Sequence, residues 1–361
     1  MFQTSRLIPV AALAALAGAA LLPPPAAVKP AVVTESAGND ADDPAIWVHP
    51  KDPSRSLVIG TNKAAAPQGA LVVYGLDGKI RQRIEPLDRP NNVDVEYGLK
   101  LAGRRTDIAV ATERYQKRLR VFRIDEKTGM LEDVSSGGGI PVFEGREGRG
   151  REPMGIALYR RPRDGAIFAI VSPKEGPLDG YLEQYLLEDD GAGKVKGRKV
   201  REFGTFSGAG EIEAVAVDDE LGYVYYADED TGLRKYHADP DHPLARKELA
   251  LFGRTGYQGN REGLAIYATG KGKGYLISTD QVKGNSRYLL YRREGTAADP
   301  HDHSEVVAVM EGGADSTDGI EATSHPLGRA WPKGMLAAMN SAGKNFFLYN
   351  WADIEAALGR R

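Results

Sequence analysis

Acidic side chains stand at the start of several short apolar runs in this 361-residue chain. They are Asp42, Asp43, Glu213, Glu262 and Asp318, and Asn92 and Asp94 add oxygen atoms in a further run. Carboxylates that converge on one place repel one another unless a cation joins them. Oxygen ligands in a chain without cysteine favour a hard cation, and the loose coordination of Ca²⁺ suits side chains from separate segments better than that of Mg²⁺. For any single one of these residues, the alternative is a turn cap that accepts backbone N–H groups.

Basic side chains follow three apolar runs directly. Lys63 comes after GTN, Arg114 after ATE and Lys174 after VSP. If each run is a strand of a repeated unit, the three cations project from the same edge of the assembly. Cations beside a metal–carboxylate cluster suit a densely anionic substrate. Taken singly, each residue is also compatible with a solvated loop.

Other phosphate-transfer motifs are missing from the sequence. The absence of cysteine excludes mechanisms that pass through phosphocysteine, and there is no RHG motif of a histidine acid phosphatase. His301 and His303 lie in the polar loop AADPHDHSE, which we expect to be solvated, with zinc binding as the alternative. The segment DEDTG at residues 228–232 is only faintly similar to an EF-hand loop, and its misplaced glycine argues against that function.

From Val32 onward, β-rich runs separated by Gly, Asn, Asp and Pro form six similar units. Each unit opens with a polar, a small and a branched residue and closes on a strand that carries an aromatic residue. The openings are Asp43–Ile46, Asn92–Val95, Met154–Ile156, Glu213–Val215, Glu262–Leu264 and Asp318–Ile320. Steps of roughly fifty to sixty residues are typical of propeller blades. We therefore predict an all-β, six-bladed β-propeller, with a β-sandwich pair or a seven-bladed ring as alternatives, and we expect Val32-Val33 to complete the blade that contains Tyr349.

The N-terminal segment has the composition of an export signal. Arg6 precedes the apolar run Leu7–Leu22, which is shorter than the ~20 residues of a membrane span and is followed by PPPAAVKPA. We predict a signal peptide over residues 1–27, a propeller domain over residues 28–361, and a secreted or periplasmic protein. An uncleaved anchor is the alternative. The net charge of −3 gives no reason to expect nucleic acid as a partner, or a membrane after cleavage.

Several stretches resemble the β-propeller phytases, which are alkaline, calcium-dependent 3-phytases. Asp40–Pro50 is similar to the N-terminal signature of that family, and Asn91–Val95 is similar to its second signature. Further similar stretches are DIAVAT, GRKVREF, VDDELGYVYYADED, EGLAIY, GKGYLIS, NSRYLLY and STDGIE. They occur in order from about residue 34 to 351, which is nearly the whole mature chain.

The resemblance implies a six-bladed propeller with calcium ions at one mouth of its channel. It also implies a cleavage site beside a second phosphate-affinity site, and attack of a calcium-bound water on phosphorus without a covalent enzyme intermediate. The implied substrate is phytate (myo-inositol hexakisphosphate) as a calcium complex, and we expect a monomer. The implied metal ligands are Asp42, Asp43, Asp94, Glu213, Glu229, Asn260, Glu262 and Asp318. The implied catalytic residues are Glu213 and Glu262, with Lys63, Arg114 and Lys174 on the phosphate oxygens.

The chain departs from the family pattern at several of these places. Ala64 follows Lys63 where a second lysine is common, and a tyrosine expected near Met154 is missing. Asn260 and Asn340 stand where acids are frequent. Each of these Asn residues lacks the charge but keeps an oxygen ligand, so we expect weaker or fewer calcium sites and a less strict preference for phytate.

Two other functions are compatible with a propeller. Six-bladed propellers also include calcium-dependent lactonases and esterases, and a propeller can bind a ligand without catalysis. A lactonase would not need basic residues around its metal site. Lys63, Arg114 and Lys174 therefore favour a phosphomonoester hydrolase.

Overall fold

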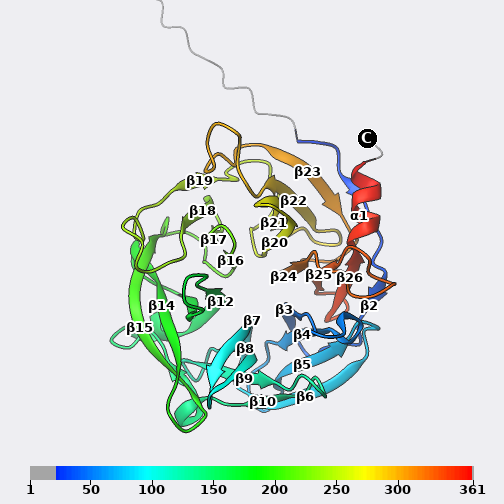
Figure 1. Cartoon of the computed structure of the whole chain (residues 1–361). Coiled ribbons are helices and arrows are strands. Elements are labelled where there is room, and N and C mark those ends of the chain that lie inside the picture. Colours follow the sequence, from blue (N-terminus) through cyan, green and yellow to red (C-terminus); the bar gives the residue numbers. More distant parts are fainter. Residues whose placement is uncertain (1–21, 360–361) are drawn as a thin grey trace, which may run out of the picture.

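The computed structural model describes residues 22–359, which form six sheets arranged as blades around a central channel (Figure 1). The colours run in chain order around the ring, so successive blades follow one another in the sequence (Figure 1). The prediction of an all-β, six-bladed β-propeller is confirmed.

Four antiparallel strands make up each blade, and their order in the chain runs from the channel outward, except that the outermost strand of the sixth blade comes from the N-terminal segment. The first two blades contain β3 (Ala41–Trp47), β4 (Leu57–Asn62), β5 (Gly69–Gly75) and β6 (Ile80–Leu87), then β7 (Pro90–Leu101), β8 (Arg104–Glu113), β9 (Arg118–Ile124) and β10 (Leu131–Asp133), with β11 (Ile140–Pro141) also on β9. The third and fourth contain β12 (Pro153–Arg160), β13 (Ile167–Pro173), β14 (Asp179–Asp189) and β15 (Val195–Thr205), then β16 (Val215–Asp218), β17 (Tyr223–Asp228), β18 (Gly232–His237) and β19 (Ala250–Phe252). The fifth contains β20 (Leu264–Gly270), β21 (Lys273–Asp280), β22 (Arg287–Arg292) and β23 (Val306–Glu311), and the sixth contains β24 (Ile320–Thr323), β25 (Met335–Asn340), β26 (Asn345–Asn350) and, from the other end of the chain, β2 (Val32–Val33). Single turns of 3₁₀ helix are η1 (Pro53–Arg55), η2 (Ser136–Gly138) and η3 (Gly148–Arg151).

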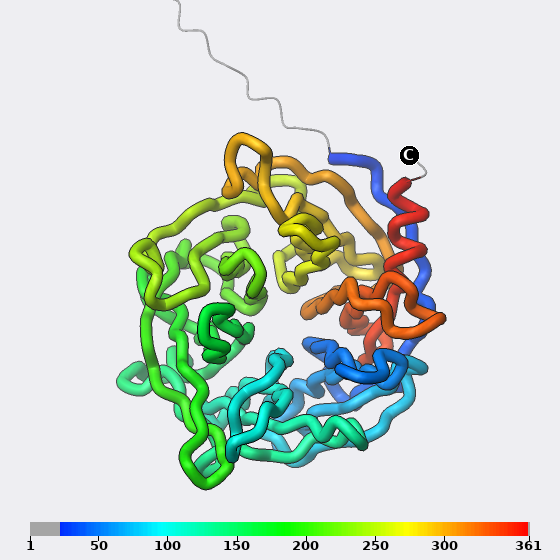
Figure 2. Tube along the Cα trace, viewed as in Figure 1, coloured from blue at the N-terminus to red at the C-terminus, as the bar shows by residue number. Residues whose placement is uncertain are grey.

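The N-terminal segment closes the ring. Val32 pairs with Leu348 and Val33 with Phe347, so β2 completes the sixth blade as predicted. Figure 2 shows this segment running beside the C-terminal part of the chain. A further short strand, β1 (Ala26–Ala27), was not predicted, and it pairs in parallel with Met310 and Glu311 of the fifth blade. The two ends of the domain therefore tie two neighbouring blades together.

Adjacent blades pack through apolar side chains from their facing sheets. Between the first two blades, for example, Trp47, Ile59 and Val73 pack with Ala109 and Phe122. The second strand β13 contains the apolar run Ile167–Val171, because both of its faces are buried against neighbouring blades. The C-terminal helix α1 (Trp351–Leu358) packs against the fifth blade, where Trp351 stacks on Tyr267 with ring centroids 3.4 Å apart.

The direction of the strands defines two rims. All first strands begin at one rim, which we call the site rim and which also carries the blade-to-blade connections and the loops between second and third strands. The loops that begin with Lys63, Arg114 and Lys174 therefore share the site rim, as the sequence predicts. Loops between first and second strands, and between third and fourth strands, form the opposite rim.

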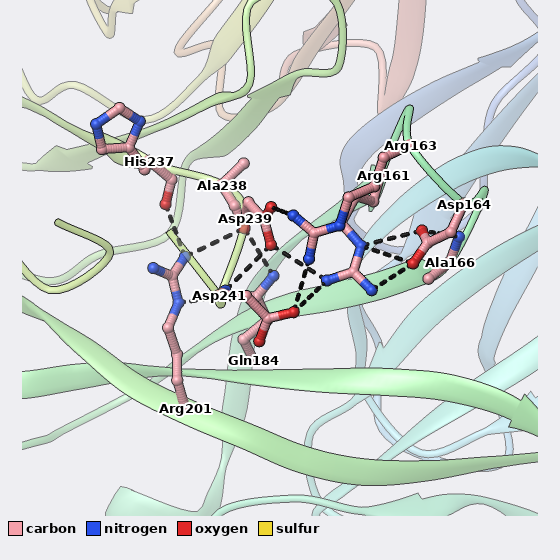
Figure 3. Close-up of polar contacts among 10 residues, drawn as sticks. All are labelled: Arg161, Arg163, Asp164, Ala166, Gln184, Arg201, His237, Ala238, Asp239 and Asp241. Carbon is pink, nitrogen blue, oxygen red and sulfur yellow. Dashed lines mark hydrogen bonds and ion pairs between the residues drawn. The ribbon is translucent and has the colours of Figure 1, made fainter. Parts of the chain in front are cut away.

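Ion pairs join the third and fourth blades at the opposite rim (Figure 3). The Arg161 guanidinium bonds Asp164 on its own loop, and it reaches Asp239 at 3.2 Å and Asp241 at 2.7 Å on the next blade. Arg163 reaches Asp241 at 2.7 Å. Charges that are shared in such a network hold the two loops in register better than isolated surface pairs do.

The loop at residues 293–305 corrects one expectation. His303 is buried, whereas we expected a solvated loop. The loop folds onto the fourth blade, so that His303 Nδ1 lies 2.8 Å from the Arg292 carbonyl oxygen and Nε2 lies 3.0 Å from Lys235 Nζ. Nδ1 therefore carries the proton and Nε2 accepts from the lysine, and burial lowers the pKa of His303 to about 4.

The predicted signal peptide falls mostly outside the described residues, which begin at residue 22. Its boundary at residue 27 therefore stays a prediction. Within residues 22–359, the structure contains no helix with the length and apolar character needed to cross a bilayer.

Candidate functional site

One ammonium group lies among three carboxylates from three blades at the site rim. Lys63 Nζ contacts the Asp42 carboxylate, and it lies 3.8 Å from Glu213 Oε1 and 3.6 Å from Asp318 Oδ2. Residues far apart in the sequence thus meet because their strands begin at the same end of the channel. We call Lys63, Asp42, Glu213 and Asp318 the mouth cluster.

The first blade supplies the acids from an irregular part of β3. The pairing of β3 with β4 shifts register between Ala41 and Pro44, which sets two consecutive acids at the mouth. Asp43 accepts a hydrogen bond from Val93 N at 3.0 Å, across the gap to the second blade. Gly319 lies so near that a Cβ there would overlap Asp43 Oδ1. Such close approach explains the small residue after the acid in this opening.

Amide side chains hold the acids of the other blades. Asn91 Nδ2 donates to Glu213 Oε1 at 2.6 Å, and Gln281 Nε2 donates to the Asp318 carboxylate. In the fifth blade, Asn260 Nδ2 lies 3.3 Å from Glu262 Oε1. Asn91 and Gln281 were not predicted as positioning residues, although Asn91 lies within the signature NNVDV.

Burial dominates the electrostatics of the cluster. It raises the pKa of Asp42 and Asp43 well above the usual range, and that of Glu262 likewise. It raises the pKa of Asp318 to about 7, although Lys63 acts in the opposite direction. Burial lowers the pKa of Lys63, but the surrounding carboxylates outweigh it, so the ammonium is retained. One ammonium is too little positive charge for these acids, and further positive charge would stabilise their ionised forms.

The donor set fits a hard cation. Both oxygens of Asp42 are buried and make no hydrogen bond of good geometry, and the buried Asn91 Oδ1 has no hydrogen-bond partner among the described residues. The nearby ligating atoms are oxygens, as Ca²⁺ prefers. Within residues 22–359, no three acidic or histidine side chains already surround a common point, and the Lys63 ammonium lies between three of the acids. Binding of an ion therefore requires these side chains to shift.

A second group of acids lies further along the channel, in a cavity of about 600 Å³ that also reaches Asp43 and Glu262. Asp94 lies here, and its two oxygens accept the N–H groups of Val95 and Leu158 at 2.6 Å each. Burial raises its pKa to about 7. No direct contact joins Asp94 to the mouth cluster, but Asp94 shares this cavity with the candidate ligands Asp43 and Glu262.

Lys174 and Glu229 lie beside an acid that was not predicted from the sequence. Lys174 Nζ contacts the Glu211 carboxylate, and the Glu211 carbonyl oxygen accepts the Glu229 N–H at 3.2 Å. Burial, followed by repulsion from Glu211 and Glu213, raises the pKa of Glu229 to about 7. This group adjoins the mouth cluster on the side of the fourth blade.

Arg114 is held by a carboxylate of the next blade. Its Nε donates to Glu152 Oε2 at 2.8 Å, and the side chain is largely buried. Glu152 gave no signal in the sequence, because its role depends on a partner from another blade. The fixed guanidinium is thus displayed at the rim in one orientation.

The structure shows where the residues that depart from the family pattern lie and what they contact. Met154 is buried and offers no hydroxyl at the mouth. Asn340 Oδ1 accepts the Asp315 N–H at 2.9 Å, and its Nδ2 donates to Asn345 at 2.8 Å. In the described chain, Asn340 therefore holds a loop of the site rim. The loop at residues 228–232 is the tight β17–β18 turn, where the Asp228 carboxylate bonds Ser207 and Arg234.

Comparison with known proteins identifies the family to which this chain belongs. The family model described as Phytase matches residues 5–360. A 3-phytase of Bacillus subtilis (strain 168) is 35% identical over 335 residues, which cover 90% of this chain and 83% of the relative. A structural-genomics protein from Bacteroides thetaiotaomicron VPI-5482 has a TM-score of 0.47 at 10% identity, covering 88% of this chain and 74% of that one. The Cps50 (Swd1) β-propeller domain of Myceliophteria thermophila has a TM-score of 0.46 at 12% identity, covering 86% and 83%. Likenesses of this size to solved structures carry no argument, but the family match over nearly the whole sequence shows that the chain belongs to the Phytase family.

Proposed function

We propose that the protein is a calcium-dependent 3-phytase that releases phosphate from myo-inositol hexakisphosphate. Its family and its Bacillus relative support the substrate. The observation that carries the calcium requirement is the mouth cluster, in which buried carboxylates of three blades share one ammonium. Those acids and the substrate are both negative, so productive binding needs cations between them.

The acidic residues differ in position, and their positions decide which of them are the better candidates for calcium ligands. Asp42, Asp43, Glu213, Glu262 and Asp318 would hold calcium, because they lie at or beside the channel mouth on four blades, and both buried oxygens of Asp42 lack a hydrogen bond of good geometry. When bound, Ca²⁺ would activate water for attack on phosphorus and offset the charge of the substrate. Asp94 is a weaker candidate, since backbone N–H groups already occupy both of its oxygens.

The basic residues would bind the phosphate oxygens. Arg114, fixed by Glu152, presents a planar fork suited to bidentate contacts, and Lys174 supplies a point charge beside Glu211. Lys63 is the cation nearest the acids and would neutralise the phosphate under attack. We infer that these three residues orient the phosphate, which raises the rate by positioning.

The N-terminal apolar segment supports export as part of this proposal, to the outside or to a periplasm. Expression of the full chain with N-terminal sequencing of the exported product checks this. A mature N-terminus near residue 28 supports it, and retention of the intact chain in the cytoplasm contradicts it.

A substrate panel tests the function against its rivals. Purified protein with calcium is given phytate, a simple phosphate monoester and a γ-lactone in separate reactions. We expect phosphate release from phytate and no opening of the lactone. Lactone opening without phosphate release would favour the lactonase function, and a folded protein inactive on all three would favour a binding propeller.

A further inference from the structure

A second cavity, of about 750 Å³, opens on the opposite rim of the propeller. We call it the rim pocket. Four loops of three blades line it: the β3–β4 and β5–β6 loops of the first blade, the β9–β10 loop of the second and the β24–β25 loop of the sixth. None of the described residues that line it belongs to the mouth cluster. Its volume is in the range of small-molecule binding sites.

Part of the wall of the rim pocket is apolar and continuous with the core. Leu327 and Trp331 belong to the core between the first and sixth blades, and Val32 and Leu76 pack against the edge of that core. The β24–β25 loop is firmly held, because the Leu327 N–H donates to the Trp331 carbonyl oxygen at 2.9 Å and the Trp331 N–H donates to the Gly328 carbonyl oxygen at 3.1 Å. The pocket therefore offers a preformed surface to the apolar part of a ligand.

The charged residues of the rim pocket leave an excess of positive charge. Arg55, Arg81 and Arg329 all line it, whereas Asp77 is the only acid among the described lining residues. Asp77 pairs with Arg81 at 2.8 Å. Neither Arg55 nor Arg329 forms an ion pair with any residue of the described chain. An anionic group is therefore the electrostatic complement of this pocket.

Arg55 keeps its charge available although it has a hydrogen-bond partner. Its guanidinium donates to the Lys127 carbonyl oxygen, which is a neutral group. The carboxylate of Asp52, on the same loop, instead accepts the N–H of Ser54 at 3.2 Å and the Ser54 hydroxyl at 2.5 Å. The positive charge of Arg55 is thus not cancelled by its neighbours in the loop.

A buried imidazole supplies a further donor. His49, which is 3% exposed, lines the rim pocket and also borders the channel cavity. Its Nδ1 accepts the N–H groups of Lys51 and Asp52 at 3.2 and 3.1 Å, so the proton of the neutral ring is on Nε2. Nε2 is buried and has no hydrogen-bond partner among the described residues. Such donors are rare in folded proteins, and a ligand oxygen would satisfy this one.

We propose that the rim pocket binds a small amphipathic anion, of which a medium-chain carboxylate is the simplest example. Its carboxylate would lie toward Arg55 and Arg329, with the His49 imidazole as a neutral donor. Its apolar chain would lie against Leu327 and Trp331. This site goes beyond the proposed phosphatase activity and does not depend on it. A polyphosphate has no apolar chain for the wall of this pocket, and an uncharged apolar molecule would leave both arginines unpaired.

Calorimetric titration with octanoate tests the site in the parent protein, in Arg55→Gln, in Arg329→Gln and in the double variant. Both arginines are exposed, so these variants should fold. Arg104→Gln is the matched control, because Arg104 is exposed at the same rim, at the start of β8, pairs with no described acid and lies outside the pocket. Separate titrations with acetate, hexanoate and octan-1-ol test the charged group alone, a shorter chain and a chain without charge.

We expect each Gln substitution in the pocket to raise the octanoate Kd by about tenfold, as for the loss of a charge-assisted hydrogen bond. Hexanoate should bind about tenfold more weakly than octanoate, because two fewer methylene groups are buried. Arg104→Gln should match the parent. Octanoate should also change the tryptophan emission of the parent but not that of Trp331→Phe, which keeps the other two of the three tryptophans.

Absence of octanoate binding by the folded parent would overturn the proposal. Equal weakening in Arg104→Gln and in the pocket variants would overturn it too, because the attraction would then come from the overall charge of the rim. Octan-1-ol that binds as tightly as octanoate would contradict an anion site. Displacement of octanoate by myo-inositol hexasulfate would place it at the channel mouth and not in the rim pocket. These results stand apart from phosphate release, so failure of the proposed function leaves them unchanged.

Discussion

Replacement of Glu213 by Gln probes the calcium site with little change of shape. Glutamine keeps an oxygen that can accept the hydrogen bond from Asn91, now 2.6 Å long, so the local structure should persist. The substitution removes one charge from a buried group of acids. We therefore expect the calcium-free variant to be at least as stable as the parent, but to bind calcium more weakly.

The expected loss of calcium affinity can be calculated from the spacing of the charges. Glu213 Oε1 lies 3.8 Å from the Lys63 ammonium, and unit charges about 4 Å apart interact by about 4 kcal/mol at an effective dielectric constant near 20. A divalent ion close to that position would interact with Glu213 about twice as strongly as a single charge does. The cost of removing water from both charged groups offsets most of this interaction energy. We expect a net loss of about 2 to 3 kcal/mol, which is roughly a 30- to 150-fold rise in the calcium Kd.

Calorimetric titration of calcium into chelator-treated protein measures this Kd, and phosphate release at graded free calcium measures its consequence. The control is Glu305→Gln, an exposed acid of the opposite rim that lies 3.6 Å from Arg292. An unchanged calcium Kd and an unchanged calcium dependence of activity in Glu213→Gln would refute the metal role of the mouth cluster.

Three other substitutions probe contacts of the mouth cluster and of the buried histidine. Lys63→Met leaves Asp42 without its only ion-pair partner among the described residues, so the calcium-free variant should lose about 3 kcal/mol in urea unfolding, and added calcium should restore most of the loss. Gly319→Ala would drive a Cβ into Asp43 Oδ1, and we expect a Tm lowered by several degrees together with weaker calcium binding by calorimetry, whereas an unchanged Tm would contradict this packing. His303 has a pKa near 4 in the folded protein and about 6.5 when unfolded, so the unfolded chain binds more protons between these values, and stability is lost as pH falls through that window, by up to about 3 kcal/mol at pH 4. His303→Gln should flatten this part of the pH dependence in urea unfolding, and an identical slope in both proteins would show that another group is responsible.

The repeated openings predicted the architecture well, because each blade needs the same local structure. A polar residue, a small residue and a branched residue recur where a first strand enters the channel, and Gly319 shows the reason, since only a hydrogen fits beside Asp43. Ring closure by Val32-Val33 could be predicted because this N-terminal strand belonged to no other blade and the blade that contains Tyr349 lacked a fourth strand. β1 has only two residues and no alternation of polar and apolar side chains, so its pairing depends on the folded fifth blade.

Site residues could be predicted from the sequence only where the repeated pattern within a single blade marks their position. Acids at strand starts could be found from their phase in the repeat. Glu152 and Glu211 could not, because their importance comes from Arg114 and Lys174 of neighbouring loops. The environment of His303 was mispredicted for the same reason, since a polar loop becomes buried only when it packs on another blade.

Phosphate release from phytate by the purified mature protein, with calcium and then after removal of calcium by excess chelator, tests the central claim most directly. We predict release that stops on chelation and returns when calcium is restored, with the propeller still folded by circular dichroism in each state. Release that continues at full rate in excess chelator would contradict a calcium-dependent site at the mouth cluster. No release under either condition from a folded sample would contradict the proposed activity itself.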